Sequence, residues 1–142
     1  DLVHEDVRPY VNAWVEVRRA LDLVQVAHGR ERRLYHPVYH YTGIQDGIFM
    51  RRGIRILPDI KTGNPDDAAT HIQTAAYEKA WLYAHPDEPV HERWAIWLKP
   101  DNVVPYIIIN YSARPEAHQD FPVFLAALTV FNSQPGRRLP IR

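Results

Sequence analysis

The 142-residue chain contains no cysteine. This excludes disulfides, cysteine-ligated zinc and an iron–sulfur cluster. No apolar run reaches the roughly 20 residues that a membrane-spanning helix needs, and there is no signal-peptide pattern. Basic and acidic residues number 17 each, so the chain has no net charge, unlike proteins that coat nucleic acid nonspecifically. These absences favour a soluble, cytoplasmic protein without a membrane partner, in which any contact with a polyanion depends on local charge.

The composition favours a packed core. Hydrophobic residues make up 46% of the chain, with four Trp and eight Tyr. A chain of this length and hydrophobicity is expected to fold as one domain over residues 1–142. Two basic clusters could contact phosphate: Arg30, Arg32 and Arg33, and Arg51, Arg52 and Arg55.

Hydrophobic periodicity predicts a single α/β domain with a mixed sheet, in the order α-β-β-β-α-β-β-α. His28-Gly29 is expected to end the first helix, Pro37 to mark an edge strand, and Arg51-Arg52-Gly53 to turn a hairpin. Asp66 or Asp67 could cap the second helix, and the tail after Pro135 is expected to be loose. The expected helices span 7–26, 68–84 and 119–132, and the expected strands span 31–41, 43–50, 53–61, 93–99 and 103–111.

The stretch from Arg55 to Gly63 carries the main functional signal. An apolar strand runs into Asp59, skips Ile60 and presents Lys61 before a glycine turn. Because side chains alternate along a strand, Asp59 and Lys61 are expected on one face and Ile60 on the other. A carboxylate and an ammonium group so placed could hold a metal-bound water against a phosphate.

Asp46, thirteen positions before Asp59, supplies a second carboxylate from the preceding strand. Hard cations such as Mg²⁺ and Mn²⁺ prefer carboxylate and carbonyl oxygens, which makes Asp46, Asp59 and the Ile60 carbonyl candidate ligands. Lys61 would orient or help to deprotonate the attacking water and offset developing negative charge.

These residues together resemble the PD-(D/E)xK nuclease superfamily, in particular its RecB-like and phage-type exonuclease branch. The resemblance rests on Thr42-Gly43-Ile44-Gln45-Asp46, on Asp59-Ile60-Lys61-Thr62-Gly63, and on Gln73 and Tyr77 one helical turn apart. It covers roughly residues 31–132 and implies a restriction-endonuclease-like α/β/α sandwich. It also implies catalytic roles for Asp46, Asp59 and Lys61, with Gln73 and Tyr77 beside the site and toward the DNA.

The chain departs from this family at its start. The family usually has an upstream helix whose His or Glu completes the metal shell, whereas this chain opens at Asp1 without a methionine, as a fragment or a processed product does. Glu31 is the best stand-in as a metal ligand, ahead of His4 and Glu16. The missing cysteines disfavour the CRISPR-associated adaptation nucleases of this type.

The resemblance implies a Mg²⁺- or Mn²⁺-dependent deoxyribonuclease of recombination, repair or phage DNA processing, in the cytoplasm of a bacterium or a phage-infected host. An exonuclease is favoured over an endonuclease. The partner would be linear or single-stranded DNA, and a homo-oligomer or a larger recombination complex is compatible with the family. The expected DNA contacts are Arg33, Arg51, Arg52, Thr62, Gln73 and Tyr77.

Other interpretations remain open. Asp59 and Lys61 could be a surface ion pair, Asp46 a turn residue, and the whole chain a nucleic-acid-binding module that does not cut. Tyr39-His40-Tyr41-Thr42-Gly43 with Tyr83 is typical of an ADP-ribosyltransferase-like NAD site, but that interpretation leaves the other motifs unexplained. The eight histidines form no His-x-x-x-His pair on a helix, which favours scattered surface histidines over a zinc site.

Overall fold

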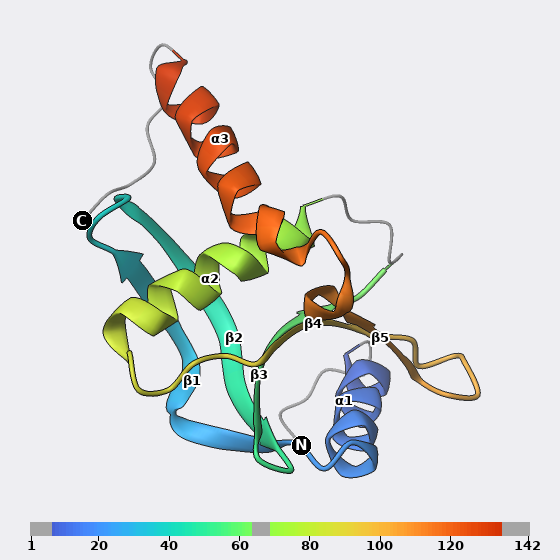
Figure 1. The fold of residues 1–142 in the computed structure, drawn as a ribbon. Helices are drawn as coiled ribbons and strands as arrows, with labels where there is room; N and C mark the ends of the chain where they lie inside the picture. The colour runs from blue at the N-terminus through green and yellow to red at the C-terminus, as the bar shows by residue number, and fades with distance from the viewer. Residues whose placement is uncertain (1–6, 64–68, 135–142) are drawn as a thin grey trace.

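A five-stranded mixed sheet, ordered β1-β2-β3-β4-β5, forms the centre of the molecule (Figure 1). The computed structural model describes residues 7–63 and 69–134, apart from the side chain of Arg32. The expected capping residues Asp66 and Asp67, the candidate His4 and the tail after Pro135 lie outside the described residues. The elements are α1 (Arg8–Ala20), β1 (Val24–His36), β2 (Tyr41–Arg51), β3 (Ile54–Lys61), α2 (Thr70–Ala84), β4 (Glu92–Leu98), β5 (Tyr106–Asn110), the short 3₁₀ turns η1 (Tyr111–Ala113) and η2 (Ala117–Gln119), and α3 (Asp120–Ser133).

Chain connections explain why the sheet is mixed. β2 and β3 form an antiparallel hairpin in which Arg51 faces Ile54. The two loop residues, Arg52 and Gly53, have φ angles of 51° and 82°, as a type I′ turn requires. β3 and β4 are parallel, and α2 provides the crossover that a parallel connection needs. The prediction of an α/β fold with a mixed sheet is therefore confirmed.

Helices cover both faces of the sheet. On one face Ala13 and Val17 of α1 pack with Phe49, Ile56 and Ile96. On the other face α2 and α3 pack against the strands through a second cluster: Ala76, Ala80, Trp81 and Leu128 with Leu34, Ile48 and Leu57. No helix among the described residues is both long and apolar enough to cross a membrane.

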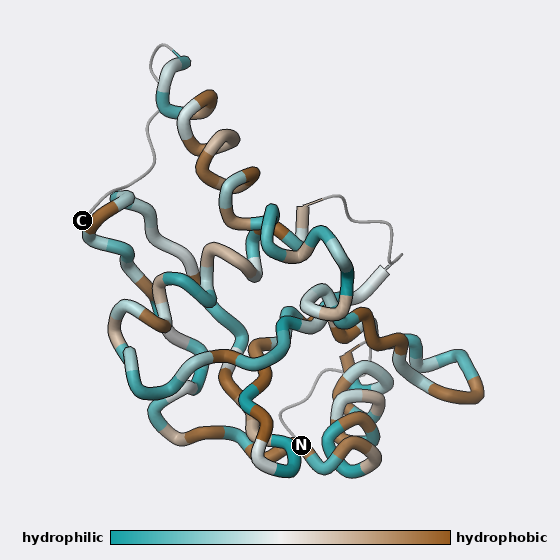
Figure 2. The backbone as a smooth tube through the Cα atoms, viewed as in Figure 1, coloured by the Kyte–Doolittle hydropathy of each residue, from teal (hydrophilic) through white to brown (hydrophobic). Residues whose placement is uncertain are grey.

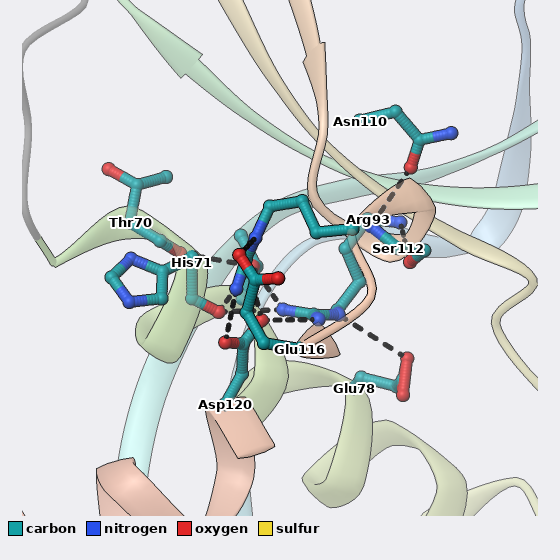
Figure 3. A network of polar contacts seen from close by, with 10 residues as sticks. Thr70, His71, Glu78, Arg93, Asn110, Ser112, Glu116 and Asp120 are labelled. Atoms are coloured by element: carbon teal, nitrogen blue, oxygen red, sulfur yellow. Dashed lines mark hydrogen bonds and ion pairs between the residues drawn. The ribbon is translucent and has the colours of Figure 1, made fainter. Parts of the chain in front are cut away.

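A buried ionic network fixes the start of α3 to the sheet and to α2 (Figure 3). Arg93 of β4 donates from Nη2 to Asp120 Oδ2 at 2.7 Å and from Nη1 to the His71 carbonyl at 2.6 Å. Arg114 donates from Nη2 to Asp120 Oδ1 at 2.7 Å. Both side chains of the Arg93–Asp120 pair are only 4% exposed, so these buried charges need the ion pairs of the network for compensation.

The rest of α3 extends away from the sheet (Figure 1). Its sequence is largely apolar, and Figure 2 shows hydrophobic segments along the projecting turns. Val123 and Val130 are 49% and 60% exposed, and only Asp120 and Leu128 in this helix are buried.

The largest error of the sequence prediction lies at residues 21–29. α1 ends at Ala20, and Asp22 adopts a left-handed conformation with a φ angle of 58°. Val24 then pairs with Met50, so the expected helix over 7–26 is too long and His28-Gly29 lies inside β1 rather than in a turn. The spacing of Leu21 and Val24 fits a helix locally, but pairing with β2 outweighs that preference. β1 is an edge strand, as Pro37 indicated, and it ends at His36 instead of residue 41.

Candidate active site

The candidate site lies where β2 and β3 stop pairing. Their ladder runs from the Arg51–Ile54 pair to the Phe49–Ile56 pair. Beyond that point the Ile60 backbone N–H of β3 donates to Asp46 Oδ2 at 2.8 Å. The Asp46 carboxylate thus satisfies an amide that a regular antiparallel ladder would pair with a backbone carbonyl. This bond brings the two sequence-predicted aspartates to the same point of the sheet.

Asp59 and Lys61 lie on one face of β3, as the strand pattern predicted, and their side chains contact each other. Lys61 Nζ lies 3.1 Å from Asp59 Oδ2, and the two side chains are 26% and 14% exposed. Ile60 packs with the core beneath α1, whereas Leu57, two residues before Asp59, belongs to the core beneath α2. Alternation therefore directs Asp59 and Lys61 toward the α2 side of the sheet.

A third carboxylate, that of Glu31, faces Asp46 across the β1–β2 ladder. Arg30 pairs with Gly47 and Arg32 with Gln45, so Glu31 lies opposite Asp46. Burial raises the pKa of Asp46 to about 6, and the carboxyl groups of Asp59 and Glu31 add to this shift. The hydrogen bond from Ile60 opposes it. Like charges directly opposite each other destabilise a sheet, so three converging carboxylates cost stability in the absence of a cation.

Tyr77 of α2 lies above the strands and within reach of these charges. Burial raises its pKa, and the charges of Asp59 and Asp46 raise it further while Lys61 opposes them. The ring covers Gly43 of β2 so closely that a Cβ added there would lie 2.4 Å from Tyr77 Cε1. A glycine at position 43 is therefore what allows α2 to approach β2 here.

Gln73 shares a pocket of about 170 Å³ with Tyr77, Thr42 and Tyr41. Ala76 and Phe124 close the same pocket. The Tyr41 hydroxyl donates to the Ala76 carbonyl at 2.7 Å, and burial raises the pKa of that hydroxyl. In the NAD alternative Tyr41 would belong to a binding site, whereas here it is a core residue that joins β2 to α2.

Of the residues expected to contact DNA, Arg33 and Thr62 lie near the carboxylate cluster, whereas Arg51 and Arg52 lie at the far end of the β2–β3 hairpin. Arg33 is exposed on β1, two residues beyond Glu31, and Thr62 is exposed just after β3. Arg52 is exposed at the distant hairpin turn. Arg51 is half-buried and donates from Nε to the Leu21 carbonyl at 2.9 Å, which gives it a role in fixing the loop after α1.

Sequence reasoning overlooked a second polar cluster, formed by His28, His85 and Glu88. His28 and His85 are 57 positions apart (85 minus 28), so no short motif signals their proximity. The interpretation of all eight histidines as scattered therefore needs correction for these two. Their proximity arises only when β1 lies beside the end of α2.

The geometry defines a cluster of three carboxylates, one lysine and one tyrosine where β2 and β3 stop pairing.

Comparisons with known proteins assign no family to the chain: no protein-family profile matches it, and no curated protein matches it. A solved structure, that of SSO0001, is similar to this chain with a TM-score of 0.44 and 14% identity. The similarity covers 89% of this chain and 58% of the other, so the chain spans little more than half of that neighbour's length.

Proposed function

We propose that this chain is a divalent-metal-dependent nuclease that hydrolyses phosphodiester bonds in DNA, with a PD-(D/E)xK-type site on a restriction-endonuclease-like fold. The observation that carries the proposal is the convergence of Glu31, Asp46 and Asp59 beside Lys61. An ordinary surface ion pair between Asp59 and Lys61 would not account for two further acids, Asp46 and Glu31, beside it. Burial raises the pKa of Asp46 to about 6, and repulsion from Asp59 and Glu31 adds to this shift. A bound cation would offset that repulsion.

The donor set fits Mg²⁺ or Mn²⁺. It consists of carboxylate oxygens, and hard divalent cations prefer such ligands. Asp46 and Asp59 would hold the ion, with Glu31 and the Ile60 carbonyl completing the protein ligands. When bound, the ion would polarise the scissile phosphate and lower the pKa of a coordinated water.

The remaining residues position the reactants. Asp59 holds the Lys61 ammonium group within 3.1 Å, where it can orient a water and offset charge that develops on the phosphoryl oxygens. The hydrogen bond from Ile60 fixes the Asp46 carboxylate. Gln73 and Tyr77 line the adjoining pocket, where they would contact the nucleotide beside the scissile bond.

The decisive experiment measures cleavage of end-labelled linear single- and double-stranded DNA with Mg²⁺, with Mn²⁺ and with EDTA. We expect metal-dependent cleavage by the wild type. In Lys61→Ala the cleavage rate should fall at least about 100-fold, as it does in enzymes that lose a group which transfers a proton or stabilises developing charge. Lys79→Ala is the matched control. Lys79 is on α2, outside the carboxylate cluster, and its ammonium group lies over the ring of Phe121 in α3. Equal activity in wild type and Lys61→Ala would overturn the site assignment.

A second candidate function is DNA binding without cleavage. It is motivated by the exposure of Glu31, the proposed third carboxylate ligand, which leaves Asp46 and Asp59 as the only partly shielded carboxylates of the described cluster. In that case the wild type binds DNA with the usual salt dependence but shows no metal-stimulated product with any of the substrates.

A further inference from the structure

A three-ligand cluster lies where β1 meets the end of α2, built from His28, His85 and Glu88. His28 Nε2 lies 2.8 Å from Glu88 Oε1 and 2.9 Å from Oε2. His85 Nδ1 lies 3.4 Å from Glu88 Oε2. One ligand atom from each of the three residues lies within 4.8 Å of the others. Two imidazoles and a carboxylate therefore converge on one point.

An irregularity in β1 places His28 there. Gln25 pairs with Phe49 and Arg30 pairs with Gly47, so residues 26–29 of β1 stand opposite Ile48 alone. Such bulges redirect side chains at functional positions. Gly29 lets the strand return to register, because a Cβ at that position would lie 2.6 Å from Ile48 Cβ.

Trp81 holds the other two residues in place. Its indole stacks on His85 with ring centroids 4.0 Å apart, and its Nε1 donates to the Glu88 carbonyl at 2.8 Å. The Glu88 N–H also donates to the His85 carbonyl at 3.0 Å. Trp81 is fully buried, and His28, whose ring also stacks on it with centroids 5.7 Å apart, remains accessible to solvent. Packing and outer hydrogen bonds of this kind orient metal ligands in proteins.

The donor set decides which ion would fit. Two imidazole nitrogens and one carboxylate are a His₂Glu set, which suits Zn²⁺ and similar transition metals and does not suit Mg²⁺. Ligand atoms about 2.1 Å from a tetrahedral ion are about 3.4 Å apart. The ligand atoms here lie within 4.8 Å of one another, so the widest separation would shrink by up to about 1.4 Å, whereas His28 Nε2 and Glu88 Oε1, now 2.8 Å apart, would move slightly apart. A fourth position would remain for water because His28 is exposed.

We propose that His28, His85 and Glu88 form a binding site for Zn²⁺ or a similar transition-metal dication, which would link the β1 bulge to the end of α2. This site is separate from the proposed nuclease centre and does not depend on it, because it shares none of its residues. The histidine–carboxylate contacts alone would also explain the cluster as an ion pair. The experiment below distinguishes the two.

The test is calorimetric titration of the untagged protein with Zn²⁺ in the presence of excess Mg²⁺. We expect one Zn²⁺ per chain at this cluster, with affinity at least about tenfold lower in His28→Gln and in Glu88→Gln. His118→Gln is the matched control, because it removes an exposed histidine on η2. Substituting His85 is avoided because its ring lies much closer to Trp81 than that of His28 does, with ring centroids 4.0 Å apart against 5.7 Å.

Two further measurements complete the test. Zn²⁺ should raise the melting temperature of the wild type and of His118→Gln but not of His28→Gln, since a ligand that binds only the folded state stabilises it. Asp46→Asn should bind Zn²⁺ as the wild type does, which separates the two metal sites. Absence of Zn²⁺ binding, or equal affinity in His28→Gln and the wild type, would overturn the proposal and leave the ion pair as the explanation.

Discussion

At the scale of single residues, Asp46 is the clearest case in which the site lowers stability. Its pKa, raised from 3.8 to about 6, means that the folded protein binds a proton more tightly than the unfolded chain does. The free energy of unfolding therefore falls as pH rises from about 4 to about 6, and the loss persists above that range. The full shift would correspond to about 3 kcal/mol, which we reduce to about 1 kcal/mol because the carboxyl group is only partly shielded from water.

Asp46→Asn should consequently be more stable than the wild type at pH 7 by about 1 kcal/mol, while losing cleavage at least about 100-fold. The asparagine carbonyl can still accept the Ile60 hydrogen bond, but the repulsion from Asp59 and Glu31 is removed. Urea unfolding at pH 7 and at pH 4 measures the effect, which should vanish at the lower pH. Asp87→Asn, at an exposed position, is the control. A destabilised Asp46→Asn at pH 7 would contradict the electrostatic account.

The same residues show what sequence can predict about a site. The positions of Asp59, Ile60 and Lys61 follow from strand alternation alone, and the structure places them accordingly. The hydrogen bond between Asp46 and Ile60 does not follow from any local pattern, because it depends on β2 and β3 parting after the Phe49–Ile56 pair. The proximity of His28 to Glu88 depends in the same way on a bulge in β1.

At the scale of elements, the attachment of α3 depends on Asp120. Burial tends to raise the pKa of Asp120, but the hydrogen bonds from Arg114 and Arg93 outweigh it and lower the pKa below 3.8. Asp120→Ala would leave the buried Arg93 guanidinium without its closest carboxylate. We expect a loss of about 3 to 5 kcal/mol in the free energy of unfolding, as when one partner of a buried pair is removed.

Urea unfolding again provides the measurement, with Glu116→Gln as the control. Glu116 also contacts Arg114, but it is exposed, and its substitution should change stability little. Because the pKa of Asp120 is lowered, its stabilising contribution is present above about pH 4 and is lost as pH falls below that value. A cost for Asp120→Ala no larger than that for Glu116→Gln would show that α3 is held by Leu128 and its apolar neighbours instead.

Element boundaries were the less predictable part of the fold. The β2–β3 hairpin follows from Gly53 between two apolar strands, since glycine readily adopts the positive φ angle that the second turn position requires. The end of α1 does not follow in this way, because the sequence from Leu21 to Val26 is compatible with either a helix or a strand. The pairing of Val24 with Met50 of β2 determines that it is a strand. Long-range pairing of this kind is absent from any local window of sequence.

At the scale of the whole molecule, zero net charge sets the expected behaviour toward DNA. A neutral protein gains no general attraction to phosphate, so affinity must come from a few placed cations. Alternation along β1 puts Arg33 on the same face as Glu31, beside the carboxylate cluster. Arg52 is six residues from Asp46, roughly 20 Å along the strand. This corresponds to about six nucleotides in duplex geometry and to fewer in an extended single strand.

The salt dependence of binding should therefore change with the length of the DNA. With single-stranded DNA of about 12 nucleotides, Arg33→Ala and Arg52→Ala should each reduce the magnitude of the negative slope of log K against log salt by about 0.7, the value for one phosphate contact. With a dinucleotide only Arg33→Ala should reduce it, because so short a strand cannot reach the hairpin turn even when it is fully extended. Fluorescence anisotropy in EDTA measures the slopes without cleavage. Arg19→Ala, on the helix that covers the opposite sheet face, is the control and should leave both slopes unchanged. If Arg19→Ala reduced the magnitude of the slope as much as Arg33→Ala did, DNA would be bound by charge spread over the surface. That result would contradict binding of the DNA strand beside the carboxylate cluster.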